Sequence, residues 1–115
     1  MKLPKLDEAV VPPEKIQDYL LNVYHDEGSG KVQFFLHFGF SVAEWKELAQ
    51  ALIRHAHDHE VVKREATRFG TRYVVEGNLE VPDGRTPTVR VVWFIARGKA
   101  NPRLATAYPV EEDHD

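Results

Sequence analysis

The first residue with a type and setting suited to acid–base chemistry is His25, in a stretch rich in Gly, Ser and Asp (residues 22–30) that predicts a loop. An imidazole with a pKa of about 6.5 exchanges protons near neutral pH, so a loop histidine suits general acid–base catalysis. Lys31, six residues further on, is predicted to begin a short helix, where its ammonium group could contact a phosphate. The alternatives are a surface histidine and a solvated lysine without a functional role.

Two arginines occupy the polar faces of two expected strands. Arg72 and Arg90 each lie in a segment in which apolar and polar residues alternate. If the two polar faces coincide, the guanidinium groups form a cationic platform that can hold a phosphate through paired hydrogen bonds. The alternative is a cross-strand ion pair with Glu76 or Glu80. The platform could be extended by Arg68 and Arg103.

The last expected strand adds two further candidates. Thr106 could donate a hydrogen bond to a phosphate, and Tyr108 could stack on a base or donate a proton. The alternative is that Leu104, Thr106 and Tyr108 form the inward face of an edge strand. Metal-free RNA cleavage needs a base, an acid and cations around the phosphate, and these residue types can supply all three. The candidate catalytic residues are His25, Lys31, Arg72, Arg90, Thr106 and Tyr108.

A histidine cluster, His55-Ala-His57-Asp-His59, stands at the predicted end of a helix. His55 and His59 have the i,i+4 spacing of metal ligands, but no Glu follows the first His as in a HExxH motif. Cationic histidines also suit a helix C-terminus, which is the alternative. No P-loop, GxGxxG or serine-elbow motif is present. We therefore predict neither a catalytic metal nor a cofactor.

The periodicity of apolar residues predicts the elements that must position these side chains. Pro12-Pro13-Glu14 predicts the start of a first helix, and helical spacing predicts two more over residues 31–37 and 42–57. Ser41 and Glu44 form a capping box at the start of the longest helix. Alternation predicts strands over residues 61–66, 71–81, 88–96 and 103–108. The expected fold class is α+β, with two or three N-terminal helices packed on a C-terminal antiparallel sheet of three to four strands.

The 115 residues, of which 43% are hydrophobic and 29% charged, fit one globular domain over residues 1–110. An acidic tail, residues 111–115, is expected to be disordered. The tail holds four of the 18 acidic residues, so the rest of the chain is close to neutral. This excludes a uniformly basic nucleic-acid-coating domain but leaves local basic patches open. The absence of cysteine excludes disulfides, thiol nucleophiles and cysteine zinc sites.

No apolar run approaches the roughly 20 residues that a membrane-spanning helix needs. Charged residues also interrupt the N-terminal segment where a signal peptide would carry its apolar core. We expect a cytoplasmic protein with no membrane partner.

Several spaced blocks carry a resemblance to a known family. They are residues 9–12, 18–22, 25, 30–31, 34–35, 69–77, 82–85, 89–93 and 102–109. In this order they resemble the bacterial family of domains of unknown function DUF6883. The layout, with helices first and a late Thr-x-Tyr-Pro strand, more distantly resembles the barnase–EndoU–colicin–RelE class of toxin nucleases. The resemblance implies RNA as a substrate and a small cognate antitoxin-like protein as a partner.

The leading hypothesis is a toxin-like, metal-free ribonuclease domain that acts on RNA by general acid–base catalysis. One rival is a non-catalytic protein-interaction module of the same fold. Another is a small-ligand site in the groove between the long helix and the sheet. The nuclease hypothesis requires His25 and the late arginines to meet around one cleft. The sequence leaves the oligomeric state open.

Overall fold

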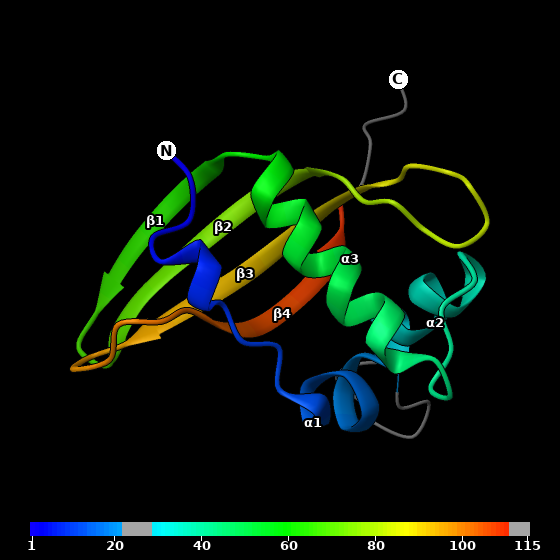
Figure 1. Cartoon of the computed structure of the whole chain (residues 1–115), viewed down its shortest axis with the longest axis horizontal. Helices are drawn as coiled ribbons and strands as arrows, with labels where there is room; N and C mark the ends of the chain where they lie inside the picture. The colour runs from blue at the N-terminus through cyan, green and yellow to red at the C-terminus, as the bar shows by residue number, and fades with distance from the viewer. Residues whose placement is uncertain (22–28, 111–115) are drawn as a thin grey trace.

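The computed structural model describes residues 1–21 and 29–110, and for residues 29–31 it describes the backbone alone. Within these ranges three helices precede a four-stranded antiparallel sheet, so the chain has the predicted α+β fold (Figure 1). None of the described helices has the length and apolar character needed to cross a membrane. The predicted acidic tail lies outside the described residues.

The first helical segment begins at Pro13, within the predicted start at Pro12-Pro13-Glu14. α1 (Pro13–Lys15) continues directly into η2 (Ile16–Leu20), a π-helical turn whose first and last residues are buried. A short 3-10 turn, η1 (Leu6–Glu8), precedes them. α2 spans Ser29–His37, and the chain leaves it through Gly39, whose φ of 102° favours glycine.

The long helix α3 (Trp45–Asp58) was predicted over residues 42–57 but begins three residues later. Ser41 Oγ accepts the backbone N–H of Glu44 at 3.2 Å, which is one half of the predicted capping box. Glu44 has a φ of −110° and a ψ of 42°, outside the helical region. The serine therefore closes a turn in front of the helix rather than capping the helix itself.

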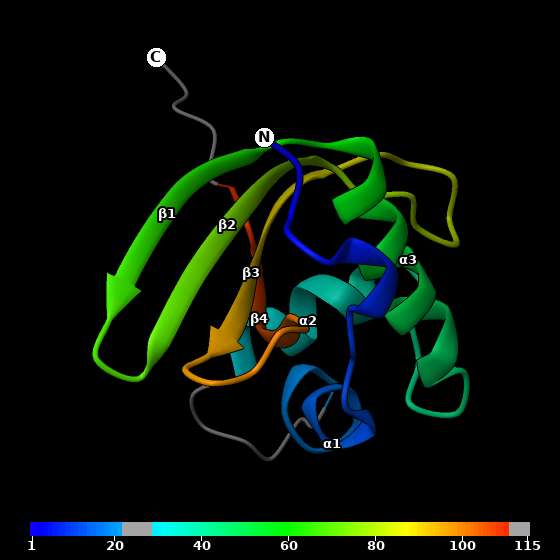
Figure 2. The ribbon, with the colours of Figure 1, turned by 60° about the vertical axis from the view of Figure 1, so that its left-hand side comes forward.

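The sheet contains all four predicted strands, β1 (Val61–Thr67), β2 (Gly70–Asn78), β3 (Thr88–Ala96) and β4 (Arg103–Pro109). Neighbours in sequence are neighbours in space, in the order β1-β2-β3-β4, and every pair is antiparallel. β2 ends three residues before the predicted boundary, and the buried residues Leu79 and Val81 belong to the connection that follows it. Figure 2 shows the β1–β2 hairpin extending away from the helices.

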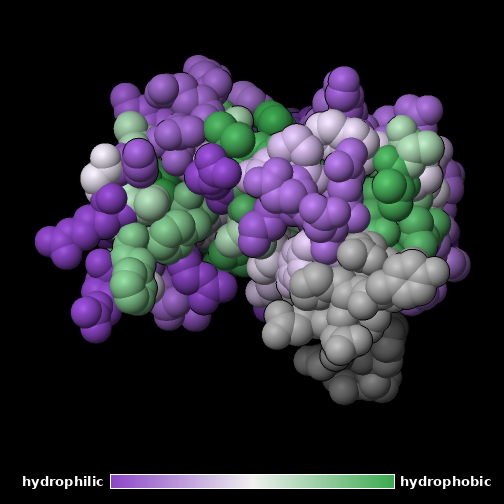
Figure 3. All heavy atoms as spheres, turned by 90° about the horizontal axis from the view of Figure 1, so that it is seen from below, coloured by the Kyte–Doolittle hydropathy of each residue, from purple (hydrophilic) through white to green (hydrophobic). Residues whose placement is uncertain are grey.

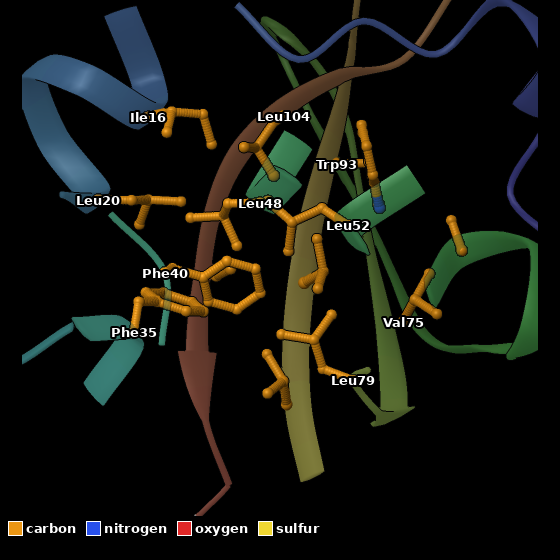
Figure 4. Packing of buried hydrophobic residues seen from close by; sticks show 14 of the residues in the cluster. Ile16, Leu20, Phe35, Phe40, Leu48, Leu52, Val75, Leu79, Trp93 and Leu104 are labelled. Carbon is orange, nitrogen blue, oxygen red and sulfur yellow. The ribbon is translucent and has the colours of Figure 1, made fainter. Parts of the chain in front are cut away.

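The two faces of the sheet have different surroundings. α3 lies across one face, where Leu48 and Leu52 join the core side chains of the strands (Figure 4). The strands contribute Tyr73, Val75, Val89, Val91, Trp93 and Leu104 to this core. Side chains alternate along a strand. Arg72 and Arg90 therefore point to the opposite face, which α3 does not cover.

Candidate functional site

The sheet face opposite α3 carries a hollow of about 490 Å³ to which all four strands contribute. We call it the sheet hollow. It is lined by Val62, Lys63, Glu65, Arg72, Val74, Glu76, Arg90 and Tyr108. Three of the six predicted catalytic residues, Arg72, Arg90 and Tyr108, thus lie around one concave surface.

Arg90 and Glu76 stand opposite each other on β3 and β2. Arg90 Nε donates a hydrogen bond to Glu76 Oε1 at 2.6 Å. This hydrogen bond and the charge of Glu76 raise the pKa of Arg90, with a smaller contribution from Tyr108, which faces Arg90 from β4. Arg90 therefore forms the cross-strand ion pair with Glu76 that the sequence analysis gave as the alternative to a phosphate-binding platform. Because a guanidinium group carries five N–H donors, the pair leaves other donors available.

Arg72 forms a longer and weaker contact. Its Nη1 lies 3.4 Å from Glu65 Oε1 on β1, and both side chains are about half exposed. Neither of the expected partners of Arg72 is used, because Glu76 faces Arg90 and Glu80 accepts a hydrogen bond from Arg54 at 2.6 Å. A contact of this kind contributes little to stability and is readily exchanged for an anionic ligand.

Thr106 and Tyr108 occupy the face opposite Leu104, which contradicts the alternative of one inward-facing row. The register of β4 against β3 shifts between Val92 and Trp93. Such a β-bulge adds one residue and reverses the alternation beyond it. Leu104 consequently packs in the core, while Tyr108 reaches the sheet hollow. Thr106 is not among the lining residues, and its Oγ1 lies 3.3 Å from the Tyr19 hydroxyl.

The two early candidates have no described side chain. His25 lies outside the described residues, and Lys31 is described only by its backbone, within α2. Their approach to the sheet hollow therefore stays a prediction.

The sequence interpretation assigned no function to three polar residues that line the sheet hollow. Glu76 was considered only as an ion-pair partner, and Glu65 and Lys63 on β1 were not considered. The sequence could have placed Glu76 on the same face as Arg72, because it lies four residues after Arg72 in one strand and residues an even number apart share a face. Lys63 and Glu65 gave no such signal, because a shift in register between Val61 and Lys63 sets which residues of β1 face the hollow.

The groove proposed for a small ligand, between α3 and the sheet, is filled by buried side chains such as Leu52 and Ala56. A hollow of about 200 Å³ lies beside α3, lined in part by Phe40, Arg54 and Glu80. It is less than half the size of the sheet hollow and contains none of the predicted site residues.

The histidine cluster joins α3 to the sheet. His55 is 2% exposed, and its Nε2 lies 3.1 Å from the carbonyl oxygens of both Gly77 and Val89, so this nitrogen donates to them. His59 Nε2 lies 2.8 Å from the carbonyl oxygen of Asn78. Both i,i+4 histidines thus use Nε2 to bind backbone carbonyls. The described part of the chain contains no group of three potential metal-ligating side chains that could hold a metal ion.

Acidification is expected to destabilise the protein through His55. Burial lowers the pKa of His55 below its ordinary value of 6.5. As the pH falls through this value the unfolded chain binds a proton that the folded chain does not. The free energy of unfolding therefore decreases by up to about 1.4 kcal/mol per pH unit from this group. Urea unfolding of wild type and His55→Gln at about pH 7.5 and pH 5.5 measures the effect.

The His55→Gln variant should show the smaller loss of stability on acidification, because an amide can donate to the Gly77 carbonyl without titrating. His57→Gln, on the exposed side of the same helix, is the control and should retain the wild-type dependence. Equal pH dependence in all three proteins would show that His55 is not the responsible group.

The fold is shared with a solved structure. One chain of a contact-dependent growth inhibition toxin–immunity protein complex from Klebsiella pneumoniae 342 is similar over 93% of this chain and 97% of that chain. The TM-score is 0.71 and the sequence identity is 18%. At this identity the likeness establishes the fold alone.

The sequence comparisons identify the family. No curated protein matches the chain. The model of the family described as "Domain of unknown function (DUF6883)" matches residues 2–111. The match spans nearly the whole sequence and confirms the resemblance carried by the spaced blocks. The chain therefore belongs to the DUF6883 family.

Proposed function

We propose that this domain is a toxin-like ribonuclease that cleaves RNA in the cytoplasm by general acid–base catalysis, without a metal, at the sheet hollow. The observation that carries the proposal is the convergence of two guanidinium groups, two carboxylates and a phenol on one concave part of the sheet face that α3 leaves open. The similarity to a chain of a toxin–immunity complex supports a toxin-like role. A cognate antitoxin-like protein would then cover the hollow and exclude RNA.

In this proposal Arg72 and Arg90 bind the scissile phosphate. Arg90 keeps its Nε on Glu76 and offers its terminal N–H groups to the phosphate oxygens. Charge that develops on these oxygens during the reaction is stabilised by donors already fixed in place. Lys31 and Thr106 keep the role of further phosphate contacts that the sequence suggested, with Thr106 outside the lining of the hollow.

The chemical step is attack of the ribose 2′-oxygen on phosphorus. The 2′-OH gives its proton to a base, the bond from phosphorus to the 5′-oxygen breaks, and the departing oxygen takes a proton from an acid. The products are a 2′,3′-cyclic phosphate and a 5′-hydroxyl end. Glu76 is the base nearest the guanidinium groups among the described residues, and His25 is the second candidate. Tyr108 is the assigned acid.

Incubation of the purified domain with total cellular RNA tests the proposal. We expect wild type to generate fragments with 2′,3′-cyclic phosphate ends, and Arg90→Gln to lower the rate by about 10²-fold, as loss of one fixed donor does elsewhere. Arg54→Gln is the matched control, because Arg54 forms an equally short ion pair with Glu80 at a distance from the hollow.

Expression in a bacterial host gives a second readout. The wild type should arrest growth, and His25→Ala should relieve the arrest if His25 takes part. No cleavage of any RNA by the wild type, or equal rates for wild type and Arg90→Gln, would overturn the proposal.

A second candidate function is a non-catalytic partner-binding module, favoured by the ion pairs that occupy both arginines. Arg90 with Glu76 and Arg72 with Glu65 leave the hollow partly neutralised. A harmless wild type that binds a cognate protein, with binding lost in Arg90→Gln, would favour this alternative over the nuclease.

A further inference from the structure

The charge of this chain is concentrated in one place although its total is small. Segments 62–72 and 94–103 contain seven of the 15 Lys and Arg residues and only one of the 18 Asp and Glu residues. The remainder of the chain holds eight basic and 17 acidic residues. The formal net charge of −3 therefore conceals a strongly cationic part and a strongly anionic part.

The fold brings these two segments together at one end of the sheet, which we call the basic end. Gly70, at the β1–β2 turn, pairs with Ala96, where the β3–β4 connection begins. The backbone N–H of Arg97 donates to the carbonyl of Phe69 at 2.9 Å, which joins the two turns directly. Both turns lie at the left of Figure 1. In Figure 3 the same end carries hydrophilic side chains around a light-green hydrophobic patch.

The cations of the basic end are mostly unneutralised. Arg68, Arg97, Lys99 and Arg103 are all exposed, and across the described ranges none of them lies in an ion pair. Glu65, the single acid, contacts Arg72 at 3.4 Å. By contrast, the arginines outside the basic end each pair with a carboxylate, as Arg54, Arg85 and Arg90 do. The basic end therefore presents a concentrated positive potential to solvent.

An exposed aromatic ring stands among these cations. Phe69, at the tip of the β1–β2 turn, is 70% exposed. The guanidinium carbon of Arg68 lies 5.3 Å from the centre of its ring. A large apolar side chain in this position makes no contribution to the core. A flat ring beside unpaired cations is the combination by which proteins bind single-stranded nucleic acid, with bases stacked on the ring and phosphates held by the cations.

We propose that the basic end binds a single RNA strand, with Phe69 stacking on a base and Arg68, Arg97 and Lys99 contacting phosphates. The inference deepens the proposed function and rests on it, because Arg72 and Lys63 belong both to the basic end and to the sheet hollow. A strand held at the basic end can thus continue into the hollow. The exposed ring favours RNA over an acidic protein, because a base offers it a face to stack on.

Binding of a fluorescent 2′-O-methyl RNA strand tests the inference, because this strand lacks the attacking hydroxyl and stays intact. Arg68→Gln/Arg97→Gln/Lys99→Gln should weaken binding by at least about tenfold and reduce the slope of log affinity against log salt by about two, since three phosphate contacts are lost. The matched control is Lys5→Gln/Lys15→Gln/Lys46→Gln, which removes the same charge from the helical part. The control should bind almost as wild type does.

Phe69→Ala separates stacking from charge. It should weaken binding by about tenfold without changing the salt slope, and Phe69→Trp should retain the affinity. Equal loss in both triple variants, or wild-type affinity in Phe69→Ala, would overturn the inference. So would competition by a poly-aspartate peptide as effective as that by unlabelled RNA of equal charge, which would indicate an acidic protein partner instead.

Failure of this RNA-binding inference can be distinguished from failure of the proposed nuclease function. If the wild type binds the strand as described but cleaves no RNA, the binding surface stands and the nuclease does not. If the wild type cleaves RNA and the basic-end triple variant binds and cleaves equally well, the nuclease stands and the binding surface does not.

Discussion

Replacing Glu76 by glutamine is expected to lower the rate of RNA cleavage by about 10²–10⁴-fold, the usual contribution of a general base. The amide oxygen of glutamine can still accept the hydrogen bond that Arg90 Nε now donates to Glu76 at 2.6 Å. The variant therefore keeps the guanidinium in place and loses only the negative charge and the ability to take a proton. RNA affinity should stay the same or rise, because one repulsive charge leaves the hollow.

Single-turnover cleavage and binding of 2′-O-methyl RNA measure these two effects separately. Glu80→Gln is the control, because Glu80 accepts an equally short hydrogen bond, from Arg54, outside the sheet hollow. It should cleave as wild type does. If Glu76→Gln retains wild-type cleavage while His25→Ala loses it, His25 is the base and the role assigned to Glu76 is wrong.

Strands β2 and β3 could be predicted because core side chains stand at alternate positions along them, whereas none of the residues of β1 is buried. In β3 Val89, Val91 and Trp93 lie in the core, Val92 on the other face is buried as well, and the predicted bounds match the observed ones. A β-bulge leaves no such trace in the sequence. Residues 104–108 read as one alternating row, and only pairing with β3 shows that Leu104 and Tyr108 face opposite sides. The predicted start of α3 was three residues too early. The hydrogen bond to Ser41 Oγ forms whether a helix or a turn follows it, so the Ser41–Glu44 pattern does not distinguish the two.

The alternation of side chains between the two faces of a strand also explains how far the candidate site could be predicted. Arg72 and Arg90 were each placed on the polar face of a strand because both alternate with apolar residues, and the two faces coincide in the structure, where both arginines line the sheet hollow. Their ion partners depend on strand register, which the sequence does not specify. The total charge does not reveal the basic end, because its two segments are separated by the 21 residues 73–93 and meet only through the antiparallel order of the strands. An exposed Phe69 was equally hard to foresee, since most phenylalanines are buried.

Truncation of Trp93 is expected to have the largest effect on stability. Its side chain is fully buried on β3, in the same cluster as Leu52 of α3 and Leu104 of β4 (Figure 4). Trp93→Ala should lower the free energy of unfolding by about 3–5 kcal/mol, because burial is lost and a cavity remains. Such a loss is a large part of the 5–15 kcal/mol that stabilises a typical domain. Urea unfolding followed by far-ultraviolet circular dichroism measures it.

Trp93→Phe should cost much less than Trp93→Ala, for two reasons. Phenylalanine keeps most of the buried aromatic surface, and it removes an indole N–H that is buried without a partner among the described residues. Trp45→Ala, at the partly exposed start of α3, is the control and should have a smaller effect than Trp93→Ala. Equal stability of Trp93→Ala and wild type would show that β3 is not fixed by this side chain. Since β3 carries Trp93 on one face and Arg90 on the other, the packing of the core would then not explain how the arginine is held at the sheet hollow.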